Sequence, residues 1–172
     1  DISHILVIDD EKNYLIVMEA LLKDAGYEVT ALNDPEMALH FLDESEVDVV
    51  ITDMKMPKLS GKEVLQRIKK SWPDLPVLIM TAFGSIESAV EAMKYGAFDY
   101  ITKPFSATYL KTRIRSLLRQ REQLQKTYLE QLLRKEKTES KENLLTPSQP
   151  VVASQDELFM QQAMEFMEAQ MD

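Results

Sequence analysis

Residues 49–57 read VVITDMKMP, and this stretch decides the fold that we predict. A run of β-branched apolar residues ends at Asp53, and Pro57 closes the turn that follows. Such a run is typical of a strand that is buried on both faces, as in a parallel sheet. Ligands of open parallel sheets bind beyond the carboxyl ends of the strands. We therefore expect Asp53 to lie at a binding site.

Four other apolar runs alternate with patterns that predict helices. We expect strands at residues 4–8, 28–32, 47–52, 76–80 and 98–101. A first helix is expected at 11–25, and three more begin at the capping residues Asp34, Ser60 and Ser85. In the first helix, helical spacing selects as one face the apolar residues Tyr14, Val17, Met18, Leu21 and Leu22. The buried faces expected for the second and third helices consist of Met37, Ala38, Phe41, Leu42, Val64, Leu65 and Ile68.

This alternation predicts an α/β fold with a flavodoxin-like, doubly wound, five-stranded parallel sheet. Right-handed crossovers leave few topologies, and we choose the strand order 2-1-3-4-5. We expect one domain at residues 1–120, followed by a long helical extension, a linker and a last amphipathic helix.

Composition excludes several classes of protein. The chain has 172 residues and a net charge of −9. It has no cysteine, which excludes disulfides and thiolate catalysis. No apolar run approaches the ~20 residues that cross a bilayer, so we expect a cytoplasmic protein without membrane contact. The chain begins at Asp1 without methionine, so we expect an excised fragment.

Residues 106–137 are expected to form one long helix that is capped by Ser106. Its apolar seam predicts a dimerising coiled coil, and a solvated stalk is the alternative. Nine basic and three acidic side chains in this range predict a solvated basic face, with a nucleic-acid contact as the alternative. The seam is interrupted by Arg121 and consists of Leu110, Ile114, Leu117, Leu124 and Tyr128.

The end of the chain differs from its beginning. Residues 138–153 are polar and contain Pro147 and Pro150, which predicts a linker. Residues 154–172 start with a capping box and carry an amphipathic stripe. One such helix cannot bury its apolar face alone. We expect it to dock elsewhere, to pair with a copy of itself or to begin a truncated output domain.

The predicted topology brings polar residues from four strand ends to one edge of the sheet: Asp9, Asp10, Asp53, Thr81 and Lys103. Three carboxylates ~5 Å apart repel one another by roughly 3 kcal/mol for each pair. Hard oxygen ligands without histidine or cysteine suit Mg²⁺. A cation, a lysine and a hydroxyl are what an incoming phosphoryl group needs, and a carboxylate can be its nucleophile. The cluster therefore predicts an aspartyl phosphate at Asp53.

Other interpretations of these residues compete with this one. An aspartate after a strand is commonly a turn former or a helix cap, but this explains the residues only singly. A haloacid-dehalogenase-type phosphatase needs an acid where Lys55 stands. Nucleotide-binding folds need a glycine-rich loop, and the chain has four glycines. An interaction or dimerisation module that works without phosphorylation remains the alternative, although such modules have usually lost an acid or the lysine.

Four segments closely resemble the receiver domains of two-component response regulators, above all those of nitrogen-regulation-type activators. They are residues 7–11, 52–57, 80–82 and 99–105. The resemblance implies a phosphoacceptor rather than an enzyme, and a histidine kinase or a histidine phosphotransfer domain as its partner. It also implies a Mg²⁺ cofactor. The homodimer that we expect follows instead from the apolar seam of residues 106–137.

The resemblance implies a role for each matching position. Asp10 and Asp53 would bind Mg²⁺ directly together with the backbone carbonyl of Lys55, and Asp9 would act largely through water. Lys103 and the Thr81 hydroxyl would contact the phosphoryl oxygens. The Ala82 amide would assist them, and Tyr100 would be an aromatic switch that turns inward when Thr81 moves.

The segment after this domain resembles the one that precedes the AraC-type helix-turn-helix domain of hybrid two-component regulators. The recognition helices themselves are absent from the sequence. We therefore expect DNA binding only through an output domain outside this chain.

Overall fold

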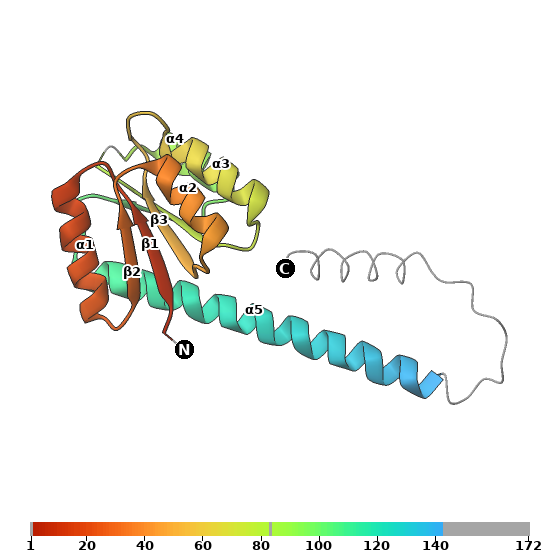
Figure 1. Cartoon of the computed structure of the whole chain (residues 1–172). Helices are drawn as coiled ribbons and strands as arrows, with labels where there is room; N and C mark the ends of the chain where they lie inside the picture. Colours follow the sequence, from red (N-terminus) through yellow and green to blue (C-terminus); the bar gives the residue numbers. More distant parts are fainter. Residues whose placement is uncertain (1, 83, 143–172) are drawn as a thin grey trace. The chain divides into compact units, whose positions relative to one another are not determined.

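The computed structural model describes residues 2–82 and 84–142, with side chains described as far as residue 137. Five parallel strands form one sheet in the order β2-β1-β3-β4-β5, as predicted (Figure 1). The strands are β1 (His4–Ile8), β2 (Glu28–Leu32), β3 (Val49–Asp53), β4 (Val77–Thr81) and β5 (Asp99–Thr102). The helices are α1 (Lys12–Asp24), α2 (Pro35–Glu44), α3 (Gly61–Ser71), α4 (Ile86–Lys94) and α5 (Ala107–Glu142).

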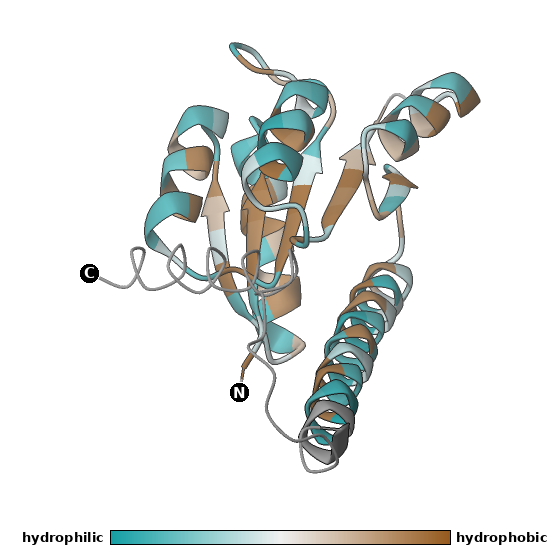
Figure 2. Cartoon of the chain, turned by 90° about the vertical axis from the view of Figure 1, so that its right-hand side faces the viewer, coloured by the Kyte–Doolittle hydropathy of each residue, from teal (hydrophilic) through white to brown (hydrophobic). Residues whose placement is uncertain are grey.

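Alternate residues of the strands enter two cores, one on each face of the sheet. In β1, Ile5 and Val7 pack with α1 and α5, whereas Leu6 and Ile8 pack with α2 and α3. The central strands are predominantly hydrophobic, and hydrophilic residues predominate on the helices (Figure 2). This double burial is what the continuous apolar run before Asp53 predicts.

The predicted caps of α2, α3 and α4 are confirmed, because each accepts a hydrogen bond from a free N–H group in the first turn of its helix. Asp34 accepts a hydrogen bond from the Glu36 N–H, and Ser60 with Glu63 forms a complete capping box. Ser85 accepts a hydrogen bond from the Ser88 N–H at the start of α4.

Two helix faces differ from the prediction. Met37 was expected in the buried face of α2, but it is exposed, and Ala38 and Leu42 are buried. In α1, Val17 is exposed and Leu15 takes a core position. Residues 14–18 of α1 are all apolar, so periodicity alone does not define one face there.

Helix α5 begins as predicted, with Ser106 accepting a hydrogen bond from the Tyr109 N–H. The first part of its predicted seam lies in the core beside the sheet: Leu110, Ile114 and Leu117 are buried. Leu124 is 72% exposed. The polar interruption has a structural reason, because Arg121 donates hydrogen bonds to the carbonyl and the carboxylate of Asp48.

The chain divides into two compact units, Asp1–Lys126 and Thr127–Asp172. Helix α5 continues past the predicted end at residue 137, to Glu142, so the predicted linker cannot begin at 138. The remainder of that linker and the predicted helix at 154–172 lie outside the described residues. Within the described part of the chain, no helix is long and apolar enough to cross a membrane.

Candidate functional site

The carboxyl ends of the parallel strands bring the predicted site residues to one edge of the sheet. Asp53 is the last residue of β3 and lies in register with Met80 of the neighbouring strand. Thr81 is the last residue of β4 and lies in register with Thr102 of β5. Asp9 and Asp10 directly follow β1. Residues far apart in the sequence therefore meet without any local motif.

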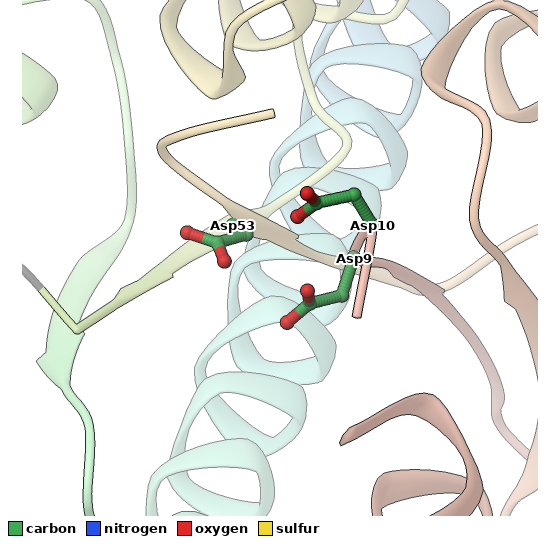
Figure 3. Close-up of side chains that lie close together, drawn as sticks. All are labelled: Asp9, Asp10 and Asp53. Atoms are coloured by element: carbon green, nitrogen blue, oxygen red, sulfur yellow. The ribbon is translucent and has the colours of Figure 1, made fainter. Parts of the chain in front are cut away.

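The three aspartates converge, as Figure 3 shows for Asp9, Asp10 and Asp53. One oxygen of each carboxylate lies within 4.8 Å of the others. Asp9 and Asp53 are buried, whereas Asp10 is exposed at the rim. The cluster therefore has a dry inner side and a side that is open to solvent.

Lys103 supplies the nearest positive charge. Its Nζ lies 2.6 Å from Asp9 Oδ2 and 3.1 Å from Asp53 Oδ2. The Glu11 carboxylate is farther away, at 3.8 Å. The Lys103 side chain is only 6% exposed, so the pairs with Asp9 and Asp53 are screened little by water.

Burial and pairing act in opposite directions on these groups. Burial raises the pKa of Asp9, although the hydrogen bond from Lys103 and the Glu11 N–H counteract this rise. Burial alone would lower the pKa of Lys103, but its hydrogen bonds to Asp9 and Asp53 more than compensate and the pKa is raised. Lys103 is therefore held as a cation. For Asp9, the hydrogen bonds offset only part of the effect of burial, so its pKa stays raised.

The backbone fixes the orientation of both buried carboxylates. The Glu11 N–H donates to Asp9 Oδ1 at 2.9 Å, and the Lys55 N–H donates to Asp53 Oδ1 at 3.2 Å. Asp53 thus has one oxygen on a backbone amide and the other on Lys103. Gly61 packs so closely on this segment that a Cβ there would collide with the Asp53 carbonyl oxygen.

The residues present fit a divalent cation. All three ligand candidates offer hard carboxylate oxygens, which suits Mg²⁺. One lysine faces three carboxylates, so a further positive charge at the cluster would offset the remaining repulsion. The exposed position of Asp10 leaves a solvent-facing side on which such an ion can keep water ligands.

The remaining predicted residues lie around this cluster. Thr81 is buried, and its carbonyl accepts a hydrogen bond from the Lys103 N–H at 2.7 Å. Ala82 follows it at the exposed end of β4. Lys55 reaches Asp53 through its amide, while the role expected for its carbonyl stays a prediction.

Tyr100 in β5 packs against the core on the α2, α3 and α4 side of the sheet. Its hydroxyl is buried and has no hydrogen-bond partner among the described residues. Burial raises the pKa of this phenol, and the nearby Ser88 side chain opposes the rise. The ring thus packs against this core while its buried hydroxyl lacks a hydrogen bond, which is rare for a buried polar atom.

Two contacts were not predicted from the sequence, one at the site and one outside it. The ring of Tyr14 lies against Lys103, with 3.9 Å from Nζ to the ring centroid. Lys58 has a positive φ of 68°, and its Nζ lies 2.7 Å from Asp34 Oδ2. An aromatic residue one turn beyond Asp10 was the available signal for Tyr14, whereas nothing local predicts the bond between Lys58 and Asp34.

Comparison with known proteins gives one family. Residues 5–115 match the family model described as response regulator receiver domain. The transcriptional regulatory protein ZraR of Klebsiella oxytoca is 44% identical over 100 residues, which are 58% of this chain and 23% of that protein. The transcriptional regulatory protein FixJ of Bradyrhizobium diazoefficiens is 41% identical over 120 residues, 70% of this chain and 58% of that protein.

Solved structures agree with this match. A receiver domain protein from Clostridium thermocellum has a TM-score of 0.68 and 42% identity, covering 72% of this chain and 99% of that one. NtrX from Brucella abortus, in complex with ATP, has a TM-score of 0.71 and 32% identity, covering 74% of this chain and 29% of that one. The chain thus spans less than two thirds of the length of ZraR, FixJ and NtrX. The family match ends at residue 115, so the predicted resemblance of the tail stays a prediction.

Proposed function

The chain belongs to the receiver domain family of two-component response regulators, and on this premise we propose that Asp53 accepts a phosphoryl group. The observation that carries the proposal is the environment of Asp53. It is a buried carboxylate at a strand end, held by the Lys55 N–H and by Lys103, with two further carboxylates within 4.8 Å. A carboxylate held in a fixed orientation is ready to act as a nucleophile.

In the proposed reaction, one oxygen of Asp53 attacks the phosphorus of a phosphohistidine on a histidine kinase or a histidine phosphotransfer domain. A P–O bond forms while the P–N bond breaks, and the imidazole nitrogen keeps the electron pair and binds a proton. Lys103 lies 3.1 Å from Asp53 Oδ2, so its ammonium can donate to a phosphoryl oxygen. The Ala82 amide would donate to another.

Asp9, Asp10 and Asp53, with the Lys55 carbonyl, would hold Mg²⁺ at this cluster. When bound, the ion supplies positive charge against the phosphoryl oxygens. The residues themselves orient the acceptor: the Glu11 N–H holds Asp9, and the Lys55 N–H holds Asp53.

The phosphoryl group would then select between two packings of the domain. We expect the Thr81 hydroxyl to bind a phosphoryl oxygen, because Thr81 ends the strand next to that of Asp53. Tyr100 lies on the strand beyond, and its unsatisfied buried hydroxyl makes it the residue best suited to change position. A ligand shifts such an equilibrium only by its difference in affinity for the two states.

The output of the switch is proposed from the relatives. Those reported above are transcriptional regulatory proteins, so we propose that this receiver controls a transcriptional output domain. We also propose that it acts as a homodimer. The exposed apolar residue Leu124 on α5 supports this, because it is not covered by the domain itself.

Phosphorylation of the chain by acetyl phosphate and Mg²⁺ tests the proposal. We expect intact mass to report one added phosphoryl group, and none in Asp53→Asn. Asp43→Asn, which removes an exposed carboxylate of α2, is the matched control and should be modified like the wild type. Modification that persists in Asp53→Asn would place the acceptor elsewhere.

A further inference from the structure

The Lys103 ammonium contacts the ring of Tyr14 as well as the carboxylates. We propose that Tyr14 is a positioning residue whose ring face holds Lys103 in place for the phosphoryl group. The inference rests on the proposed function of Asp53 and goes beyond it, because it assigns a role to a residue outside the acid cluster.

The geometry around Lys103 Nζ carries the proposal. The ammonium has Asp9 Oδ2 at 2.6 Å, Asp53 Oδ2 at 3.1 Å and the centroid of the Tyr14 ring at 3.9 Å. A cation within about 6 Å of a ring centroid is attracted by the negative face of the ring, and most strongly where water is excluded. The Lys103 side chain is 6% exposed, so little water weakens the attraction between its ammonium and the ring.

Tyr14 itself is held firmly. It lies in the first turn of α1, four residues after Asp10, and is half-buried. Its ring meets that of Phe105 in an edge-to-face contact, with centroids 6.1 Å apart and planes at 76°. Both rings also pack against the core formed by α1, α5 and the sheet. The ring face is therefore presented to Lys103 from a fixed direction.

An aromatic face suits a lysine that has to change partners. When Asp53 becomes phosphorylated, its carboxylate loses charge, and the ammonium has to turn toward a phosphoryl oxygen. A hydrogen-bond acceptor in place of Tyr14 would compete for the protons of Lys103. The ring attracts the charge without demanding a particular N–H direction, so the contact persists while the ammonium turns.

The hydroxyl of Tyr14 is not the active part in this account. Burial raises the pKa of the phenol, so it stays neutral and offers Lys103 no counter-charge. Two substitutions at this position should therefore differ in effect. Tyr14→Phe keeps the ring face, while Tyr14→Leu keeps only apolar volume.

Binding of beryllofluoride, a stand-in for the phosphoryl group, tests the proposal in the full chain with saturating Mg²⁺. We expect Tyr14→Leu to weaken beryllofluoride binding about tenfold and Tyr14→Phe to change it by less than about twofold. Affinity for Mg²⁺ alone should be unchanged in both variants, which a general distortion of the site would not allow. Tyr14→Met serves as a second non-aromatic replacement if the leucine variant does not fold.

The matched control is Tyr95→Leu, which removes another tyrosine that has a lysine, Lys62, over its ring. It should bind beryllofluoride like the wild type. Equal binding by Tyr14→Leu and the wild type would overturn the role of Tyr14, as would an equal loss in Tyr14→Phe and Tyr14→Leu. Failure of the wild type to bind beryllofluoride would instead overturn the proposed function.

Discussion

Lys103 Nζ lies 2.6 Å from Asp9 Oδ2, and neither side chain has appreciable contact with solvent. The pair joins the loop after β1 to the loop after β5, two positions that the sheet order separates by β3 and β4. Asp10 and Asp53 add two more carboxylates to the same place. The site is therefore built with more negative charge than its lysine offsets, and added cations should stabilise the fold.

We predict that Mg²⁺ raises the thermal midpoint of the chain. An ion that binds only the folded state adds about 2.7 kcal/mol to the free energy of unfolding when its concentration is about a hundredfold above Kd. Asp10→Ala should remove most of this gain, since Asp10 is the exposed ligand candidate, while Lys103 pairs with Asp9 and Asp53. Differential scanning calorimetry with and without Mg²⁺ measures the effect. Asp43→Ala is the control and should respond to Mg²⁺ like the wild type. A wild-type midpoint that does not change with Mg²⁺ would contradict a metal site.

Replacing Lys103 should show how much the buried carboxylates lower the stability of the fold when they have no partner. We predict that Lys103→Met lowers the free energy of unfolding by about 3 kcal/mol at neutral pH, because Asp9 is left buried without its partner. The double variant Lys103→Met with Asp9→Asn should regain part of this loss, because no unpaired carboxylate remains at position 9. Urea titration of the four species in the absence of Mg²⁺ gives the coupling. Simple additivity of the two substitutions would show that the pair does not matter.

Much of the fold was predictable because it depends on local signals. Each strand is an apolar run with a clear end, and each cap residue stands where a helix begins. The faces of α1 and α2 were less certain, and Val17 and Met37 were misassigned. Burial there depends on which side of a helix meets the sheet, and an apolar stretch such as residues 14–18 does not encode that.

The part of the site that follows from the strand order was predictable from the sequence. Once the strand order is known, Asp9, Asp53 and Lys103 have to meet at one edge. The contact of Tyr14 with Lys103 and the bond from Lys58 to Asp34 depend on side-chain directions across different elements. Periodicity and spacing hold no information about those directions.

The bond between Lys58 and Asp34 predicts a pH dependence of stability. The hydrogen bond from Lys58 lowers the pKa of Asp34 below its usual value, and the hydrogen bond from the Glu36 N–H adds to this effect. A carboxylate with a lowered pKa contributes its stability above its unfolded pKa and loses it as the pH falls through the folded value. We therefore expect stability to fall more steeply below about pH 4 in the wild type than in Asp34→Asn. The asparagine still caps α2 but does not titrate.

Urea titrations across this pH range measure the two slopes. Asp43→Asn, on the same helix, is the control and should follow the wild type. Parallel curves for the wild type and Asp34→Asn would show that the Lys58 bond contributes nothing to folding. Lys58→Met should flatten the wild-type curve in the same sense, since it removes the main cause of the lowered pKa.

Two leucines of the predicted seam in α5 differ in burial, so we expect different effects when each is replaced. Leu117 is buried in the core beside the sheet, so Leu117→Glu should unfold the domain. Leu124 is 72% exposed, so Leu124→Glu should leave the fold and the Mg²⁺ response intact. If α5 forms a coiled coil with a second copy, that variant should be monomeric where the wild type is a dimer, because a charge in the seam is costly.

Light scattering at several concentrations, with circular dichroism as the check on folding, distinguishes these outcomes. Gln125→Glu adds the same charge beside the seam and should stay dimeric like the wild type. A wild type that is monomeric at high concentration would exclude the coiled coil and leave α5 a solvated stalk. A dimer that survives Leu124→Glu would locate the interface elsewhere in the domain.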